Sequence, residues 1–240
     1  MDEFKVERQI AVITGAGQGI GRATAKKLAA TGVHVVLVGR TLSKLEAVVH
    51  EIQTSGYTAV AAPLDITLSG QVEQFARALA ASDSKLDMLI NCAGEAFVAS
   101  LVDTDEADWD RILNVNLKGP YLMTQALLPL LRRSENPSIV NLVSKVALKG
   151  YEPVAAYTAA KTGLLGFTRA LAAELRCEEI RVVALCPGPV DTPMRWEATP
   201  DFDRKLVIDT ESVASTIQHL VTLPRGVTMG EILLQSVHYD

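Results

Sequence analysis

The sequence has few of the residues that cross-link a fold or hold a metal ion. Its 240 residues include three cysteines, Cys92, Cys177 and Cys186, and no cysteines or histidines with the spacing of zinc ligands. This count argues against a disulfide framework, and we predict no metal site. A chain of this length can bury a substantial hydrophobic core without such cross-links.

Long apolar runs and clustered basic residues are also missing. No run approaches the ~18 apolar residues of a membrane span, and the first ten residues, MDEFKVERQI, show no signal-peptide pattern. The formal net charge is −5, and no stripe of lysine or arginine offers a surface for nucleic acid. We therefore expect a cytoplasmic protein that binds neither membrane nor nucleic acid.

Short apolar runs alternate with longer helical patterns along the chain. Because the runs are continuous, they predict strands that helices cover on both faces. The alternation predicts a parallel sheet with right-handed crossovers, in one doubly wound α/β domain over 1–240. The predicted strands are 10–14, 33–38, 58–64, 86–91, 138–144, 180–186 and 231–236. The predicted helices are 20–31, 42–55, 68–82, 107–131, 154–176 and 212–222.

A glycine-rich turn, GAGQGIG at 15–21, follows the first predicted strand. Glycine lets a backbone approach a ligand closely, and the N-terminus of the following helix presents free N–H groups to an anion. The turn therefore predicts a pyrophosphate cradle, with a ligand-free turn as the alternative. The residues expected to contact a dinucleotide are Gly15, Gly17, Gln18, Gly19 and Ile20.

The second predicted strand ends without the acidic residue that would hold the adenosine ribose of NAD. Gly39 and Arg40 stand there instead, and an arginine can fork onto a 2′-phosphate. The pair predicts NADP(H) over NAD(H), and it argues against a methyltransferase, which would need an acid at this place. After the third strand, Asp65, followed by Ile66, would accept from the adenine amino group or cap the helix beginning near Thr67.

The fourth predicted strand ends in Asn91, Ala93 and Gly94. Small residues at this point would let a cofactor cross close above the sheet. Asn91 would tie neighbouring loop backbones together by hydrogen bonds. A plain turn without a ligand is the alternative interpretation.

Tyr157 and Lys161 are the polar residues of an otherwise small and apolar stretch, VAAYTAAKTGLLGF. Residues four apart lie on one helix face, with Cβ atoms about 6 Å apart. A nearby ammonium favours phenolate, and a positively charged nicotinamide would add to the effect, which predicts a Tyr157 pKa lowered by ~2–3 units. Ser144, ending the fifth strand, would polarise a carbonyl, and Asn116 would hold a water between Lys161 and solvent.

These motifs, in this order and spacing, resemble the short-chain dehydrogenase/reductase family over essentially the whole chain. The resemblance implies a Rossmann-type domain with a seven-stranded parallel sheet, and reversible hydride transfer between NADP(H) and an alcohol/carbonyl pair. Tyr157 would be the acid in reduction and the base in oxidation, and Lys161 would also bind the nicotinamide ribose. Ser144 would orient the carbonyl and Asn116 would support the proton relay. The segment after the sixth strand would meet the nicotinamide carboxamide through Pro187, Gly188, Val190 and Thr192.

Two departures from the family pattern bear on the substrate. The chain ends in GEILLQSVHYD rather than a VDGG-like tail, which is more similar to NADP-dependent enzymes acting on 3-hydroxy acids, small carbonyls and related alcohols. Lys145 follows Ser144, and it either favours an anionic substrate or is solvated or paired. The alternatives are a 3-oxoacyl-acyl-carrier-protein reductase and a cofactor-binding sensor without turnover.

The long connection 188–210 carries Met194, Trp196 and Phe202, which predicts a lid over an apolar pocket. A surface loop that packs its own aromatic residues is the alternative. Helices 107–131 and 154–176 have more apolar residues than one buried face needs, and the resemblance implies a homodimer or homotetramer built on them. At the end of the first, Arg132 and Arg133 would complement the helix dipole or dock a carrier protein.

Overall fold

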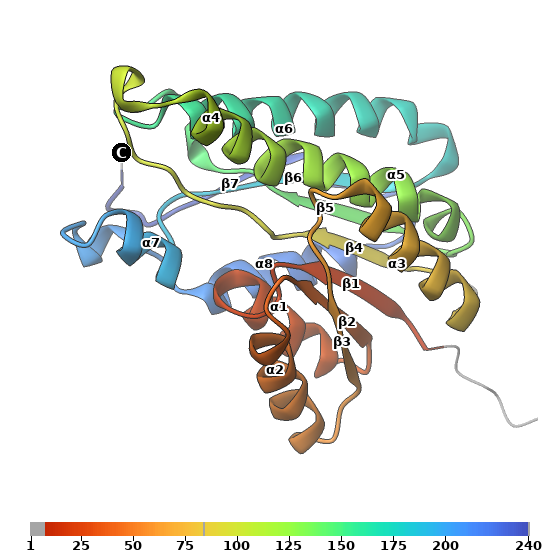
Figure 1. Ribbon diagram of the computed structural model, residues 1–240. Coiled ribbons are helices and arrows are strands. Elements are labelled where there is room, and N and C mark those ends of the chain that lie inside the picture. Colours follow the sequence, from red (N-terminus) through yellow and green to blue (C-terminus); the bar gives the residue numbers. More distant parts are fainter. Residues whose placement is uncertain (1–7, 84, 240) are drawn as a thin grey trace, which may run out of the picture.

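The computed structural model describes residues 8–83 and 85–239, and it places a parallel sheet between two layers of helices (Figure 1). The strand order is β3-β2-β1-β4-β5-β6-β7, so the direction of winding reverses between β1 and β4. The predicted doubly wound fold and its seven parallel strands are confirmed. The strands are β1 (Ile10–Thr14), β2 (His34–Gly39), β3 (Ala59–Pro63), β4 (Met88–Asn91), β5 (Ser138–Leu142), β6 (Arg181–Pro187) and β7 (Glu231–Leu234).

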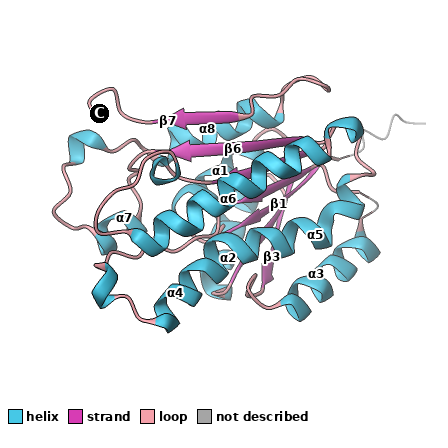
Figure 2. Ribbon diagram, turned by 90° about the horizontal axis from the view of Figure 1, so that it is seen from above, coloured by secondary structure: helices cyan, strands magenta, loops and turns pink. Residues whose placement is uncertain are grey.

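Helices cover both faces of the sheet. The layer with α1, α2 and α8 lies on one face, and α3, α5 and α6 lie on the other with α4 beside α6 (Figures 1 and 2). None of the described helices has the length and hydropathy needed to cross a membrane. The helices are α1 (Gly19–Ala29), α2 (Leu42–Thr54), α3 (Ser69–Ser82), α4 (Glu106–Leu113), α5 (Gly119–Leu131), α6 (Ala155–Glu174), α7 (Pro193–Ala198) and α8 (Thr210–Val221).

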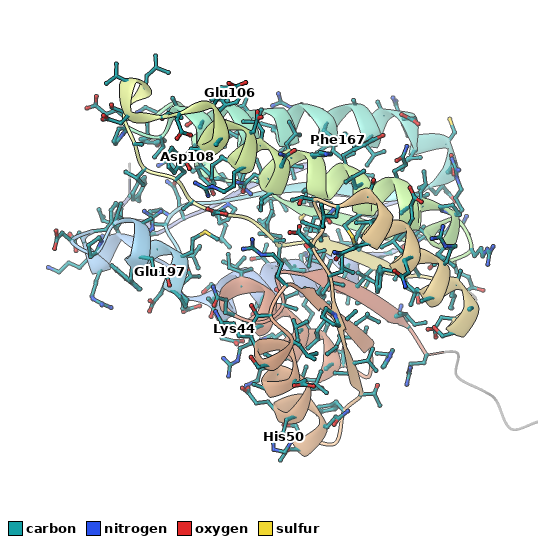
Figure 3. All side chains as sticks on the ribbon, in the orientation of Figure 1. Lys44, His50, Glu106, Asp108, Phe167 and Glu197 are labelled. Carbon is teal, nitrogen blue, oxygen red and sulfur yellow. The ribbon has the colours of Figure 1, made fainter. Side chains whose placement is uncertain are left out.

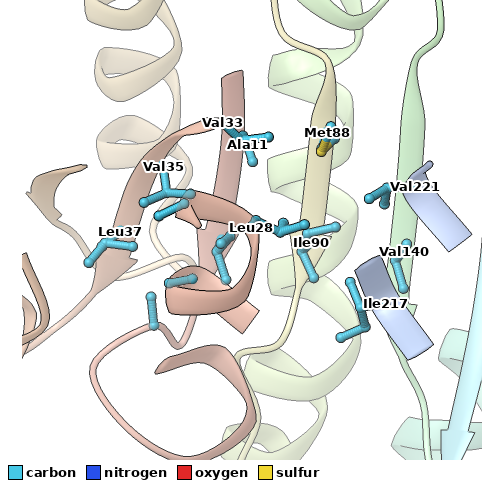
Figure 4. Close-up of a cluster of buried hydrophobic side chains, with 14 of the residues drawn as sticks. Ala11, Leu28, Val33, Val35, Leu37, Met88, Ile90, Val140, Ile217 and Val221 are labelled. Carbon is cyan, nitrogen blue, oxygen red and sulfur yellow. The ribbon is translucent and has the colours of Figure 1, made fainter. Parts of the chain in front are cut away.

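The continuous apolar strands fill two separate cores. Neighbouring strand residues point to opposite faces, so Ile13 belongs to the core under α1, α2 and α8, and Val12 to the core under α3, α5 and α6. Figure 4 shows the first core, where Leu28 of α1 and Ile217 of α8 meet the sheet. Each such fully buried side chain contributes about 1.5–3 kcal/mol. The alternation along each strand therefore determines which of its side chains pack against each helix layer.

One predicted helix, 107–131, is interrupted by a π-helical turn at Asn114–Lys118, between α4 and α5. The Asn116 Nδ2 atom donates to the Ile112 carbonyl at 3.0 Å, the acceptor that a regular helix gives to the Asn116 backbone N–H. The side chain competes with the helix for this carbonyl. The prediction of one uninterrupted helix is therefore wrong at this turn.

The connection 188–210 also contains structure that the sequence analysis missed. Helix α7 begins at Pro193, and its N-cap Thr192 accepts from the backbone N–H of Arg195 at 3.2 Å. The Thr-Pro pair is a helix-start signal that was available in the sequence. Figure 1 shows α7 at the edge of the molecule toward which the strands point their carboxyl ends.

Candidate active site

Two adjoining cavities lie beyond the carboxyl ends of the strands, near the reversal in strand order. The first, here the glycine-turn cavity, has a volume of ≈ 250 Å³ and is lined by the 15–21 turn and Arg40. The second, here the tyrosine cavity, has a volume of ≈ 380 Å³ and is lined by Ser144, Tyr157 and Lys161. The residues that line both are Ile20, Cys92, Gly94, Thr192 and Met194. One extended ligand could therefore reach from one cavity into the other.

The glycine turn packs too closely for side chains. Gly15 has a φ of +67°, and a Cβ on it would lie 2.8 Å from the Ala93 Cα. A Cβ on Gly21 would lie 2.4 Å from the Gly15 carbonyl oxygen. These glycines bring the turn against the β4 loop and leave the start of α1 open to a ligand.

The N-terminus of α1 fits an anion. Its N-cap residue, Gln18, makes no capping hydrogen bond, and the first turn carries no acidic residue. The Gln18 Oε1 atom instead accepts from the Lys44 ammonium at 2.9 Å, and Lys44 lies on α2 in the lower layer (Figure 3). Free N–H groups, the helix dipole and this lysine together favour phosphate at the mouth of the turn.

Arg40 lines the far end of the glycine-turn cavity. Its side chain is exposed and has no hydrogen bond or ion pair with any residue that the structure describes. A guanidinium without a protein partner remains available to a phosphate. The structure thus places Arg40 where the sequence predicts it, beside the cradle.

Asp65 and Ile66 close another side of this cavity. The Asp65 Oδ1 atom accepts from the backbone N–H and the hydroxyl of Thr67, at 2.9 and 2.8 Å. The following helix begins only at Ser69, with Leu68 as N-cap, so Asp65 stabilises a turn rather than capping α3. Its other carboxylate oxygen makes no hydrogen bond with a described residue and can still accept from a ligand.

Asn91 lies in a buried polar network beneath the cavities. Its Nδ2 atom donates to the Asn141 Oδ1 atom at 2.8 Å, and Asn141 donates to the Thr168 hydroxyl at 2.9 Å. The neighbouring Ala93 N–H donates to the Thr14 hydroxyl at 3.0 Å, which joins the β4 loop to β1. The sequence analysis missed Asn141, although an asparagine inside the apolar run SIVNLVS was a visible signal.

Tyr157 and Lys161 share a face of α6 and both line the tyrosine cavity. The Lys161 Nζ atom lies 5.7 Å from the centre of the Tyr157 ring and donates to the Leu142 carbonyl at 2.8 Å. Lys161 is buried, so its ammonium is held by the end of β5 rather than by water. Ser144 lies within hydrogen-bonding reach of Tyr157. The structure brings these three side chains together.

Burial shifts the pKa values of both Tyr157 and Lys161. Burial raises the pKa of this phenol, and the effect exceeds the opposing effects of the Ser144 hydrogen bond and the Arg195 charge. Burial also lowers the pKa of Lys161 to about 8. The protein's own residues therefore keep Tyr157 protonated, because desolvation outweighs the Ser144 hydrogen bond and the Arg195 charge. The lowering expected from the ammonium and a bound nicotinamide together stays a prediction.

Asn116 is fully buried in the π-helical turn and faces the β4 loop. Both hydrogens of its amide are used, because Nδ2 donates to the carbonyls of Glu95 and Ile112 at 3.0 Å each. The Oδ1 atom accepts from the Glu95 N–H at 3.2 Å. A Cβ on Gly94 would lie 2.8 Å from this oxygen and 3.5 Å from the Lys161 Nζ atom, so Asn116 and Lys161 meet across Gly94. Asn116 can thus act on a water only as an acceptor.

The segment after β6 returns across the tyrosine cavity. Pro187, Gly188 and Val190 line this cavity, and Thr192 lines both cavities. Val190 pairs with Ile208 as an isolated parallel bridge, which ties the two ends of the segment together. The segment is therefore held in place at its base while α7 projects beyond the bridge.

The three large apolar residues of this segment, Met194, Trp196 and Phe202, lie in different surroundings. Phe202 and Met194 line the tyrosine cavity, whereas Trp196 donates to Asp191 at 2.6 Å and stacks under Arg204 at 4.2 Å. The expectation that Trp196 covers the pocket therefore has no support in the structure. The sequence analysis also missed two lining residues, Arg195 and Tyr239, because no motif marks them.

Lys145 is buried in the wall of the tyrosine cavity rather than solvated. Its Nζ atom lies 3.9 Å from the centre of the Tyr239 ring. A cation over an aromatic face is attracted by the ring quadrupole. The structure thus excludes a solvated Lys145 and places it in the wall of the tyrosine cavity, where it packs on Tyr239.

Comparison with known proteins gives a consistent result. A family model described as short chain dehydrogenase matches residues 9–203. An uncharacterized oxidoreductase of Staphylococcus epidermidis is 32% identical over 236 residues, 97% of this chain and 99% of that protein. A 3-oxoacyl-[acyl-carrier-protein] reductase of Synechocystis is 33% identical over 226 residues, 90% of each. The solved structure of an alcohol dehydrogenase from the archaeon Thermococcus sibiricus, complexed with 5-hydroxy-NADP, has a TM-score of 0.90 at 28% identity, covering 98% of this chain and 99% of that one.

Proposed function

The chain belongs to the short-chain dehydrogenase family, and we propose that it is an NADP(H)-dependent enzyme that interconverts an alcohol with its ketone or aldehyde. The substrate would be a small or medium molecule such as a ketone, a 3-hydroxy acid or a similar compound. One observation carries the proposal: Ser144, Tyr157 and Lys161 converge on a cavity that adjoins an anion-binding glycine turn.

The residues of the glycine-turn cavity would hold the dinucleotide. The α1 N-terminus and Lys44 would bind its pyrophosphate, and Arg40 its 2′-phosphate, which favours NADPH over NADH. The remaining contacts that we propose come from Asp65, Ile66, Asn91, Ala93, Gly94, Pro187, Gly188, Val190 and Thr192. When bound, NADPH supplies the hydride that the carbonyl carbon accepts. The 5-hydroxy-NADP named for the Thermococcus sibiricus structure supports this cofactor.

Tyr157 would supply the proton that completes the reduction. Burial raises its pKa, so the phenol is protonated at neutral pH and ready to act as an acid. The carbonyl oxygen would accept hydrogen bonds from Tyr157 and Ser144, and the Tyr157 proton would move to that oxygen as negative charge develops there. The product is the alcohol, and the phenolate that remains lies near the Lys161 ammonium.

Lys161 and Asn116 would support this proton transfer without contacting the carbonyl oxygen. The Lys161 ammonium stabilises the phenolate of Tyr157 and can bind the nicotinamide ribose. Asn116 fixes the Glu95 backbone next to Lys161 through hydrogen bonds of 3.0 and 3.2 Å. Its Oδ1 atom would accept from a water that returns a proton from solvent.

A second candidate is reduction of a 3-oxoacyl group on a carrier protein, and the Synechocystis relative supports it. Arg132 does not favour carrier docking, because its guanidinium forks onto Glu178 at 2.6 and 2.8 Å. Comparing a 3-oxoacyl thioester on a carrier protein with the same acyl group on a short thiol would discriminate the two candidates. A preference of at least about tenfold for the carrier-bound form would favour the second.

We also propose that 188–210 acts as a lid and that the chain forms a homodimer or homotetramer. The lid rests on the bridge between Val190 and Ile208, with α7 beyond it. The oligomer would use the outer surfaces of α5 and α6. There Tyr121 is 42% exposed although it makes an edge-on contact with Phe167, a residue that Figure 3 labels on α6.

The proposal is tested by the loss of NADPH absorbance with a panel of ketones. Tyr157→Phe is expected to lower turnover by about 10²- to 10⁴-fold, because it removes the acid without changing the size of the ring. NADPH affinity, measured by calorimetry, is expected to stay close to that of the native protein. Tyr57→Phe, at an exposed tyrosine outside both cavities, is the matched control. Equal turnover by Tyr157→Phe and the native protein would refute the assignment of Tyr157.

A further inference from the structure

The tyrosine cavity is rich in positive charge. Lys145, Lys161 and Arg195 line it, and among the lining residues that the structure describes the single acidic one is Glu152, whose side chain is exposed. Lys161 has a place in the proton transfer. Lys145 and Arg195 have none in it, and the partly buried guanidinium of Arg195 calls for a ligand with the opposite charge.

One edge of the Arg195 guanidinium has a hydrogen-bond partner, whereas the other edge faces no acceptor among the described residues. Its Nη1 atom donates to the Thr199 hydroxyl at 3.0 Å, and its guanidinium lies 4.9 Å from the centre of the Phe202 ring. The Nε and Nη2 atoms have no partner among the described residues. The side chain is partly buried, so these donors are costly to leave unpaired.

Elsewhere the protein shows what this edge of an arginine binds. Arg132 uses Nε and Nη2 to hold both carboxylate oxygens of Glu178, at 2.6 and 2.8 Å. Arg169 holds Glu231 in the same way, at 2.6 and 2.9 Å. Arg195 presents the same two donors in the wall of the tyrosine cavity, and no carboxylate of residues 8–83 or 85–239 binds them.

Arg195 is also the first member of a column of stacked side chains in the cavity wall. The column runs from Arg195 through Phe202 and Tyr239 to Lys145. Phe202 stacks on Tyr239 with ring centres 6.3 Å apart, and the Lys145 ammonium lies 3.9 Å beyond, on Tyr239. The column keeps the guanidinium from turning away, since its planar face is occupied by Phe202. Two cations thus flank an aromatic wall beside the reacting groups.

We propose that the substrate carries a carboxylate close to its carbonyl group, and that the Nε and Nη2 edge of Arg195 binds this carboxylate. The inference rests on the proposed function and narrows its substrate class to oxo acids and hydroxy acids. A charge-assisted fork would fix the position of the carbonyl as well as contribute affinity, because both groups belong to one small molecule. Lys145 adds positive field from the opposite end of the column.

The test uses pairs of compounds that differ in this charge alone. Reduction of 2-, 3- and 4-oxo acids of four to six carbons is compared with reduction of their methyl esters, at saturating NADPH. For at least one spacing, the native protein is expected to favour the acid. In Arg195→Gln the ratio of kcat/KM for that acid to kcat/KM for its ester is expected to fall by about 10- to 150-fold. Arg195→Lys is expected to lie between the two.

Arg204→Gln is the matched control. It removes one positive charge and one aromatic stack from the same segment, but Arg204 packs on Trp196 and does not line the cavity. The acid-to-ester ratio is expected to stay within about twofold of the native value. A similar fall in this control would show that a general field, and not the Arg195 fork, selects the acid, and would overturn the proposal.

Two further outcomes would also overturn it. One is an equal loss for acid and ester in Arg195→Gln together with a shifted pH profile, which would mean that Arg195 acts on Tyr157 instead. The other is that the native protein reduces neutral ketones but prefers no acid over its ester. This outcome would refute the carboxylate site and would leave the proposed function unaffected.

Binding measurements separate the inference from the proposed function. Calorimetry of the matching hydroxy acid with the NADP⁺-saturated protein needs no turnover. Weaker binding by Arg195→Gln supports the inference even where Tyr157→Phe shows the catalytic assignment to be wrong. Equal binding of the hydroxy acid by both proteins would overturn it. Absence of binding by either protein at hydroxy-acid concentrations on the order of 10 mM, which would detect even a weak complex, would also overturn it.

Discussion

The glycine-turn cavity takes its shape from backbone, whereas the tyrosine cavity takes its shape from side chains of separate segments. In the first, Gly15 and Gly21 leave no room for a Cβ, and the open N–H groups of α1 face the ligand. In the second, Lys145, Arg195 and Tyr239 come from three places that meet only in the folded chain. The shape of the first cavity is therefore set within one turn, whereas the shape of the second depends on how distant segments meet.

The two cavities also differ in how burial acts on their chemistry. In the tyrosine cavity, burial raises the pKa of Tyr157 and lowers that of Lys161 to about 8. In the glycine-turn cavity, Arg40 is exposed, and its proposed role depends on charge and shape rather than on burial. Variants and pH should therefore affect the two cavities separately.

The largest expected effect is at the backbone of the glycine turn. Gly21→Ala places a Cβ 2.4 Å from the Gly15 carbonyl oxygen, so the turn must move and its N–H groups lose their alignment. NADPH affinity, measured by calorimetry, is expected to fall at least about 100-fold, which corresponds to two charge-assisted hydrogen bonds. Binding of NADPH with native affinity would contradict the backbone origin of this cavity.

Gly70→Ala provides the control for this change. Gly70 lies in α3, and a Cβ there would meet no atom within 4 Å. Its NADPH affinity is expected to be native, and its free energy of unfolding is expected to be unchanged or higher by about 0.4–1 kcal/mol. A large loss in both variants would point to general sensitivity to alanine rather than to the turn.

A smaller effect is expected at Arg40, the exposed side chain that we propose selects the cofactor. Arg40→Asp removes the partner of a 2′-phosphate and repels it, while a carboxylate can accept from ribose hydroxyls. The ratio of kcat/KM with NADPH to that with NADH is expected to fall by about 10- to 150-fold. Arg77→Asp makes the same charge change on α3, outside both cavities, and should leave the ratio unchanged. No change in Arg40→Asp would remove Arg40 from cofactor selection.

The smallest expected effect is a pH dependence that differs between the two cavities, in the reduction rate for one and in NADP affinity for the other. Lys161 carries its charge below its pKa of about 8, so the phenolate formed at Tyr157 loses this stabilisation as pH rises above that value. The rate of ketone reduction is expected to fall by up to about tenfold per pH unit above 8, and this fall should be absent in Lys161→Met. NADP affinity should change less than the rate between pH 7 and 9. A constant reduction rate up to pH 9.5 would show that the charge of Lys161 is not needed.

The sequence was informative wherever function depends on contiguous residues. The spacing of Tyr157 and Lys161 placed both on one face of α6, and the glycines at 15–21 marked the turn that lines the first cavity. The π-helical turn at Asn116 was not predicted, because a side chain that takes a backbone carbonyl leaves the apolar periodicity intact. Arg195 and Tyr239 were missed because their importance comes from neighbours far away in the chain.

The sequence by itself determined the alternation of strands and helices, the covering of the sheet on both faces and the glycine-rich turn, because apolar periodicity and glycine spacing act over a few neighbouring residues. The tertiary structure alone decided the balance of burial and charge at Tyr157 and the cationic wall of the cavity that holds it. Desolvation and Coulomb interactions depend on distances in space, and residues such as Lys145 and Tyr239 acquire those distances only when the chain folds.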